Sequence, residues 1–327
     1  MERTLYLHIG HGKTGSSYLQ TCFALSRGAL RRARIDYVFH ESFDRARRGG
    51  ITSGNGDFAA PAIAGRFPAA LRRFLAARRA GSGGIDALLS YESLFDALMK
   101  PGAEERLKRL AARGGFSRVR ILLFIRDPFE HLSSIHQQWI KRHGRTEGIN
   151  ETARRYGAPF LVAGFIRRYA GLADVELTVR NYSRRRGEIA EVAEAWLGVP
   201  EGALDRPDQP TVNRTLTLAE LEVQRLLNRH FGASSRLAAD PLAERLPHIA
   251  AERPLPGPVV SRAMAKRLAA PVKEVNAFVG PDDAYRLEPP DVGAPRERLR
   301  SYRLSGRQLE VLIDAFAAEI KRRPLRF

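Results

Sequence analysis

The sequence predicts an α/β fold with a central parallel sheet flanked by helices and a helical elaboration towards the C-terminal end. Short apolar runs that suit strands alternate with longer amphipathic segments that suit helices, an order typical of parallel sheets with helices on both faces. Two of the runs, residues 5–9 and 118–125, lead straight into a turn and a helix start. Since ligands of open α/β sheets bind at the carboxyl ends of strands, we expect a binding site where these runs end.

Each element follows from local signals. Residues 118–125, RVRILLFI, form the most apolar strand of the chain, and Pro128 suits the first position of a helix over 128–143. Residues 40–56, polar and rich in Arg and Gly, predict a surface loop able to close over a ligand. The other expected strands are residues 35–39, 85–91 and 175–179. The other helices expected in this part are residues 17–34, 67–80, 103–113, 159–170 and 188–197.

The length of 327 residues allows one large domain. We predict a single domain over residues 1–327. Residues 1–200 form its α/β core with the binding site, and residues 201–327 are mostly helical, with amphipathic helices at 216–231 and 306–321.

The composition favours anionic partners. Lys and Arg total 54 against 36 Asp and Glu, which gives a formal net charge of +18. Nucleic acid, an acidic glycan, an anionic membrane surface and a phosphorylated cofactor are all compatible with this charge. The single cysteine, Cys22, excludes an intrachain disulfide, and no apolar run approaches the roughly 18 residues of a membrane span. We expect a cytoplasmic protein without an integral membrane span.

The turn after the first strand has the composition of an anion-binding loop. Gly10, Gly12 and Gly15 surround Lys13, and a helix start follows. Glycine permits positive φ and close approach of the backbone to a ligand, while the N–H groups of a first helical turn carry a partial positive charge. Hydroxyl donors come from Thr14, Ser16 and Ser17. The turn therefore predicts a site for a phosphate or a sulfate group.

A P-loop that holds a nucleoside triphosphate is the first candidate for this turn, but its spacing does not match. Gly12-Lys13-Thr14 would need a further glycine at position 7, where the chain has Leu7. Arg126 stands where an aspartate for Mg²⁺ would follow the apolar strand, and a cation there attracts a second anion. A kinase that uses ATP and Mg²⁺ stays an alternative, because it shares the strand–loop–helix arrangement. A basic nucleic-acid-binding protein is a second alternative, although the Arg-rich runs are typical of polar helix faces and loops.

Two segments together resemble the sulfotransferase superfamily. Residues 8–20, HIGHGKTGSSYLQ, resemble its 5′-phosphosulfate loop, and residues 125–139, IRDPFEHLSSIHQQW, resemble its 3′-phosphate motif. Residues 88–95, LLSYESLF, are similar to the strand end that presents a catalytic glutamate in glycan-type members. The segments VRNYS and NRTLTLAELEVQRLLNRHF look like those of bacterial carbohydrate sulfotransferases.

This resemblance implies that the donor is 3′-phosphoadenosine 5′-phosphosulfate (PAPS) and that the product is adenosine 3′,5′-bisphosphate (PAP). We expect that no metal is required, because the glycine-rich turn, Lys13 and Arg126 supply the positive charge. The resemblance also implies that Arg126 and Ser134 hold the 3′-phosphate, with Ser133 one residue away as a competitor for this contact. The 5′-phosphosulfate would be held by Gly12, Lys13, Thr14, Gly15, Ser16 and Ser17. The implied acceptor is a hydroxyl of a carbohydrate or glycoconjugate, and the net charge is also compatible with a substrate at an anionic membrane surface.

The same resemblance assigns the chemical roles. Lys13 would neutralise the leaving oxygen, and Glu92, at the end of the strand expected over 85–91, is the first candidate for the base that accepts the acceptor proton. His8 and His11 flank the loop and are alternative bases. His8 alternates with apolar residues, so it also suits a buried strand position without a catalytic role.

Overall fold

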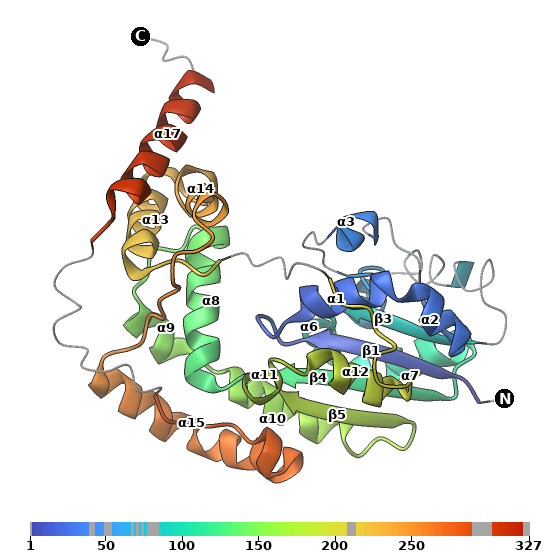
Figure 1. Cartoon of the computed structure of the whole chain (residues 1–327). Helices are drawn as coiled ribbons and strands as arrows, with labels where there is room; N and C mark the ends of the chain where they lie inside the picture. Colours follow the sequence, from blue (N-terminus) through green and yellow to red (C-terminus); the bar gives the residue numbers. More distant parts are fainter. Residues whose placement is uncertain are drawn as a thin grey trace. The chain divides into compact units, whose positions relative to one another are not determined.

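The computed structural model describes residues 2–38, 43–48, 54–66, 69, 72, 75–76, 85–207, 214–289 and 303–322. Five parallel strands form one sheet in the order β2-β3-β1-β4-β5 (Figure 1). The prediction of an α/β fold with a central parallel sheet is thereby confirmed. The strands are β1 (Thr4–Gly10), β2 (Ile35–Tyr37), β3 (Asp86–Tyr91), β4 (Arg118–Ile125) and β5 (Val175–Asn181).

The central strand β1 brings three strand ends together. Ile9 is in register with Tyr91 of β3 on one side and with Leu123 of β4 on the other. Because all strands are parallel, their carboxyl ends lie at one edge of the sheet. This edge therefore receives the glycine-rich turn after β1, Glu92 after β3 and Arg126 after β4.

The described chain divides into two compact units. The first unit holds the sheet and comprises residues 1–127, 158–211 and 270–285. The second comprises residues 128–157, 212–269 and 286–327. The prediction of one domain over 1–327 is not tested by this division and stays a prediction.

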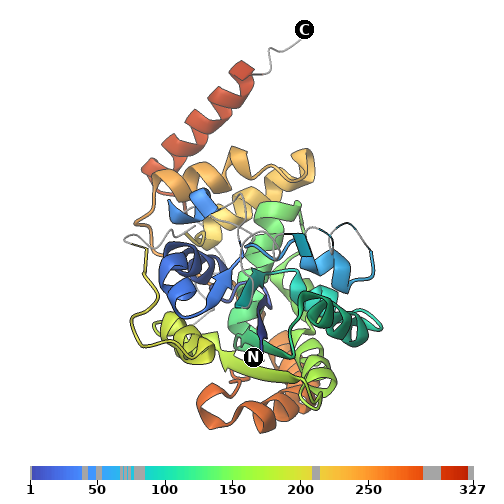
Figure 2. The ribbon, with the colours of Figure 1, turned by 90° about the vertical axis from the view of Figure 1, so that its right-hand side faces the viewer.

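Helices cover both faces of the sheet in the first unit (Figure 2). Apolar side chains of α1 (Ser16–Leu25), α2 (Arg27–Arg32) and α12 (Ile189–Leu197) form one core with the face of the sheet that carries Tyr6 and Phe124. Leu5, Leu7 and Ile9, each fully buried, point to the opposite face. The other helices described in this unit are α3 (Phe43–Arg47), α4 (Ala59–Ile63), α6 (Leu94–Leu98), α7 (Ala103–Gly114), α10 (Ala158–Tyr169) and α11 (Tyr182–Arg185), together with η2 (Pro281–Asp283).

The described residues of the second unit form helices without a strand. They are α8 (Pro128–His143), α9 (Ile149–Arg155), α13 (Leu218–Phe231), η1 (Ser235–Leu237), α14 (Ala239–Arg245) and α17 (Gly306–Arg322). Helix α15 (Pro258–Val279) contributes its first part to this unit and its last part to the sheet-containing unit.

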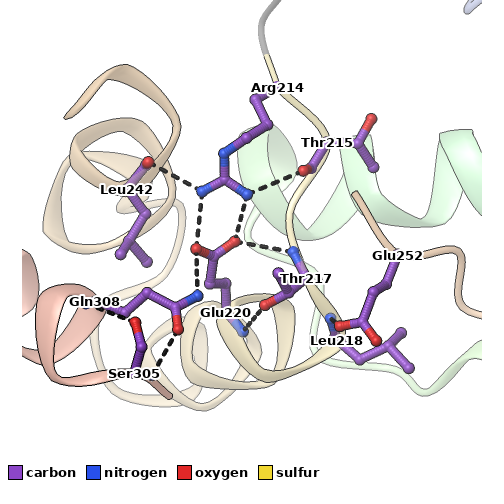
Figure 3. A network of polar contacts seen from close by, with 9 residues as sticks. All are labelled: Arg214, Thr215, Thr217, Leu218, Glu220, Leu242, Glu252, Ser305 and Gln308. Carbon is purple, nitrogen blue, oxygen red and sulfur yellow. Dashed lines mark hydrogen bonds and ion pairs between the residues drawn. The ribbon is translucent and has the colours of Figure 1, made fainter. Parts of the chain in front are cut away.

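A buried ion pair organises the second unit (Figure 3). Nη1 and Nη2 of Arg214 donate to the carboxylate of Glu220, each at 2.8 Å. Gln308 of α17 donates to the same carboxylate at 2.8 Å. Glu220 also completes a capping box with Thr217 at the start of α13. One carboxylate thus joins the start of α13 to α17.

Two predicted elements differ from the structure. The single helix expected over 17–34 is wrong, because Ser26 separates α1 from α2: it is buried, and its hydroxyl accepts a 2.6 Å hydrogen bond from the N–H of Asp205. The surface loop expected over 40–56 is wrong where it is described, since α3 is helical and Asn55 is fully buried. The helix expected over 67–80 falls largely outside the described residues.

Among the described residues, no helix is both long enough and apolar enough to cross a membrane.

Candidate anion-binding and active site

The turn between β1 and α1 has a backbone that suits an anion. We call residues 10–15 of this turn the anion cradle. Gly12, Lys13 and Gly15 have φ angles of 78°, 56° and 83°, all in the left-handed region. At Gly15 a side chain would also clash, because a Cβ there would lie 2.9 Å from Cε2 of Tyr182. Lys13 adopts this conformation without being glycine, which costs on the order of 1 kcal/mol and concentrates strain where the ligand is expected.

The start of α1 presents unused donors to this turn. Gly15 is the N-cap of α1 and provides no side-chain cap, and the first turn of the helix holds no acidic residue. The hydroxyls of Thr14 and Ser16 are buried and have no hydrogen-bond partner among the described residues. A buried hydroxyl without a partner is costly unless a ligand satisfies it. These features fit a bound anion with several acceptor oxygens, such as a phosphosulfate.

Arg126 reaches the cradle from the adjacent strand end. Its Nη1 donates to the main-chain oxygen of Lys13 at 3.0 Å, and its guanidinium carbon lies 5.5 Å from the ring centroid of Tyr182. The side chain is half-buried. The predicted proximity of Arg126 to the glycine-rich turn is therefore present in the structure.

The neighbouring Asp127 has partners of its own. Its carboxylate accepts a 2.9 Å hydrogen bond from Nδ2 of Asn181 and lies 2.9 Å from Nη2 of Arg184. Its main-chain N–H donates to the hydroxyl of Ser183 at 3.1 Å. Residues from the end of β5 and from α11 thus fix the turn that carries Arg126.

Glu92 lies directly beside the cradle. A Cβ added to Gly10 would come within 3.1 Å of Cα and Cγ of Glu92, so a side chain at this position would require Glu92 to shift. The side chain reaches solvent, but surrounding protein atoms remove part of its hydration, and this desolvation raises the pKa of the Glu92 carboxyl. The positive charge of Lys13 acts in the opposite direction and lowers this pKa to a smaller extent. A carboxyl with a raised pKa next to a cation suits general base chemistry near neutral pH.

The two histidines occupy different environments. His8 is 1% exposed, lies edge-on to Phe23 and Phe124, and shares a 2.7 Å hydrogen bond between its Nδ1 and the hydroxyl of Ser90. Burial lowers the pKa of His8 to about 3, which favours a neutral structural side chain. His11 lies on the cradle and packs edge-on to Phe95, and burial lowers its pKa to about 4. Both remain predicted alternatives for the base, with His11 the better placed.

The predicted serines lie on helices of different units. Ser17 is half-buried in the first turn of α1, next to the cradle. Ser134 is half-buried on α8, in the second unit, and Ser133 beside it is 2% exposed. Ser134 is more exposed than Ser133, which is consistent with the expectation that Ser134 and not Ser133 contacts the 3′-phosphate. That contact stays a prediction.

The sequence patterns did not single out Asn55, whose side chain bonds the main chain of β3 two residues before Glu92. It lies in the segment assigned to a surface loop, and its only signal is the Gly54-Asn55-Gly56 run, which is typical of a turn. In the structure it is buried between the ends of β2 and β3.

Comparison with models of protein families, with curated proteins and with solved structures finds no match.

Proposed function

We propose that the chain is a sulfotransferase that moves the sulfuryl group of PAPS to an acceptor hydroxyl. The observation that carries the proposal is the pair of cationic groups at adjacent strand ends, Lys13 in the cradle and Arg126 bonded to its main chain. PAPS has anionic groups at two ends, so it suits a site with two cationic groups.

The cradle supplies the donors for the 5′ end. The uncapped first turn of α1 and the buried hydroxyls of Thr14 and Ser16 would bind phosphosulfate oxygens. Arg126 would bind the 3′-phosphate, for which a guanidinium is well suited because it donates from several N–H groups in one plane.

Two side chains would carry the chemistry. When bound, PAPS supplies a sulfuryl group, and its transfer to a hydroxyl leaves PAP. Lys13 would neutralise the negative charge that develops on the leaving phosphate oxygen. Glu92 would accept the proton of the acceptor hydroxyl, a role that fits its raised pKa and its position against Gly10.

We propose a carbohydrate or glycoconjugate hydroxyl as the acceptor. The choice of this acceptor rests on the resemblance of the Glu92 segment to glycan-type sulfotransferases and on the net charge of +18, which suits an acidic saccharide. A screen of neutral, acidic and cationic saccharides and of phenols, with a labelled sulfate donor, tests it. Transfer to a cationic or purely phenolic acceptor alone would contradict the acidic-glycan proposal.

Calorimetry with the full chain tests the donor. We expect PAP to bind in the presence of EDTA, and to bind more tightly than ATP does with Mg²⁺. A kinase would show the reverse order and would need the metal. Tight binding of single-stranded RNA or DNA without measurable PAP binding would instead favour the nucleic-acid-binding alternative.

A further inference from the structure

A side-chain amide takes the place of a peptide group where β2 and β3 separate. Oδ1 of Asn55 accepts a 2.7 Å hydrogen bond from the N–H of Ser90, and its Nδ2 donates to the main-chain oxygens of Val38 at 2.9 Å and Leu88 at 3.0 Å. The register of β2 with β3 ends at Tyr37 and Leu88. Asn55 therefore satisfies the backbone groups of β3 that β2 no longer reaches.

The main chain around Asn55 binds the same strand end. The N–H groups of Asn55 and Gly56 both donate to the oxygen of Ser90, at 2.9 and 3.2 Å, and Gly54 forms an antiparallel bridge with Tyr91. A Cβ at Gly54 would lie 1.9 Å from the oxygen of Ser90, so a residue with a side chain cannot occupy this position without moving the segment.

These contacts end one residue before Glu92. Ser90 is held through its N–H and its oxygen by residues 54–56, and through its hydroxyl by His8 of β1. Tyr91 is held by Gly54, and the next residue, Glu92, lies against Gly10 of the cradle. The end of β3 is thus held by the 54–56 segment as well as by its pairing with β1, where Ile9 is in register with Tyr91, and both contacts fix the main chain that leads into Glu92.

We propose that Asn55 is a positioning residue for Glu92. Its amide, with the main chain of residues 54–56, holds the carboxyl end of β3 so that Glu92 stays against the anion cradle. The inference rests on the proposed function only in taking Glu92 as the base. Asn55 itself contacts main-chain atoms and not Glu92, so it acts through the strand.

The chain offers a control of matched chemistry. Asn228 of α13 is also buried, and its Nδ2 donates to two main-chain oxygens, those of Ile140 at 2.7 Å and Arg145 at 3.0 Å. Its Oδ1 accepts a hydrogen bond from Gln224 at 2.8 Å. Asn228 belongs to the second compact unit, whereas Asn55 and the sheet belong to the first. Asn55→Ala and Asn228→Ala therefore remove similar hydrogen bonds from different parts of the chain.

The experiment measures the pKa of Glu92 by carboxyl NMR on the full chain, with the Glu92 signal assigned by its loss in Glu92→Gln. We expect Asn55→Ala to lower the pKa of Glu92 towards its ordinary range, because a loosened strand end lets water return to the carboxyl. We expect Asn228→Ala to leave this pKa unchanged. In the transfer assay, Asn55→Ala should lower kcat about 10- to 100-fold, with the Kd for PAP changed by less than about threefold.

Two results would overturn the inference: an unchanged Glu92 pKa in Asn55→Ala, or losses of kcat and PAP affinity that parallel a fall in Tm and also occur in Asn228→Ala. If Asn55→Ala does not fold, Asn55→Ser replaces it, since its single hydroxyl can donate to only one of the main-chain oxygens of Val38 and Leu88 and adds no charge near Glu92. A wild-type chain that transfers no sulfuryl group refutes the proposed function alone. The NMR comparison then still decides whether Asn55 positions Glu92.

Discussion

Lys13 combines an unusual backbone with the charge that the proposed reaction needs. Its φ of 56° turns its main-chain oxygen towards Arg126, and its side chain is exposed beside Glu92. Replacement by alanine retains the main-chain contact and removes the ammonium group together with the side chain beyond Cβ. We expect Lys13→Ala to lower kcat by about 10²- to 10³-fold, the usual effect of losing one donor to a developing negative charge. Calorimetry should show PAP affinity largely retained, and an equal loss of binding and turnover would contradict a role in the transition state.

The hydroxyl of Thr14 provides a test in which binding and stability move in opposite directions. It is buried without a partner among the described residues, so Thr14→Val removes an unsatisfied polar group at nearly constant volume. We expect the Tm of the ligand-free chain to stay the same or rise, and PAP to bind about tenfold more weakly.

Thr21 on the same helix is the matched control for Thr14. It is also buried, but its hydroxyl donates to the main-chain oxygen of Ser17 at 3.0 Å. Thr21→Val should therefore lower the Tm and leave PAP affinity unchanged. A lower Tm in Thr14→Val, as in Thr21→Val, would mean that its hydroxyl has a structural partner and is not reserved for a ligand.

The raised pKa of Glu92 predicts the pH dependence of turnover. A general base acts when deprotonated, so kcat should rise with pH through the pKa of Glu92, which desolvation holds above the ordinary carboxyl range. Loss of the Lys13 charge would raise this pKa further and move the acid limb to higher pH. A pH series with wild type and Glu92→Gln checks this, and a Glu92→Gln variant with near-normal turnover would transfer the role to His11 or His8.

At the scale of elements, the predictions succeeded where the signal was local. The strand β4 was predicted with its observed bounds because eight residues of high apolarity end at an Arg-Asp-Pro turn. The order of strands brought the glycine-rich turn, Glu92 and Arg126 to one edge, as expected for a parallel sheet. The proximity of Arg126 to Lys13 follows from this arrangement.

The elements that were wrong depend on partners far away in the sequence. The break at Ser26 is stabilised by Asp205, 179 residues later, and the burial of Asn55 depends on main-chain groups of β2 and β3. A window of local sequence contains neither partner. Asn55 therefore looked like a turn residue, although the structure uses its amide as part of the sheet.

Two neighbouring residues of helix α17 in the second unit have different surroundings. Gln308 is 4% exposed and donates to the carboxylate of Glu220, while Arg307 beside it forms an exposed pair with Glu310. Gln308→Ala should lower the free energy of unfolding by about 1.5–3 kcal/mol, because it removes a hydrogen bond to a buried charged group. Arg307→Ala should change it by less than about 1 kcal/mol, as is usual for exposed pairs. Urea unfolding of both variants tests this, and equal effects would contradict it.

The pH dependence of the same network has a defined sign. Burial alone would raise the pKa of the Glu220 carboxyl, but hydrogen bonds from Arg214, Gln308 and the N–H of Thr217 outweigh it and lower the pKa. A carboxyl with a lowered pKa in the folded state stabilises the fold above its ordinary pKa, near 4.5, and this contribution is lost as the pH falls below that value. The stabilising effect of Gln308 should therefore be largest near neutral pH.

The net charge of +18 could attract anions in two ways: at a specific site, or through the positive electrostatic field of the whole surface, called the general field below. Arg126 and Arg109 separate the two cases, because either substitution by alanine removes one positive charge. Arg126 bonds the cradle, whereas Arg109 is exposed on α7. We expect Arg126→Ala to weaken PAP binding by about 10- to 100-fold, since it removes a charge-assisted contact, and to leave the binding of adenosine 5′-monophosphate, which lacks the 3′-phosphate, nearly unchanged. Arg109→Ala should retain the preference of wild type for PAP.

Calorimetry at about 0.1 M and about 1 M salt, where the screening length falls from about 10 Å to about 3 Å, completes the comparison. A general field predicts equal losses for both variants and for both nucleotides, and these losses would disappear at high salt. A specific site predicts a loss confined to Arg126→Ala and to PAP that persists at high salt.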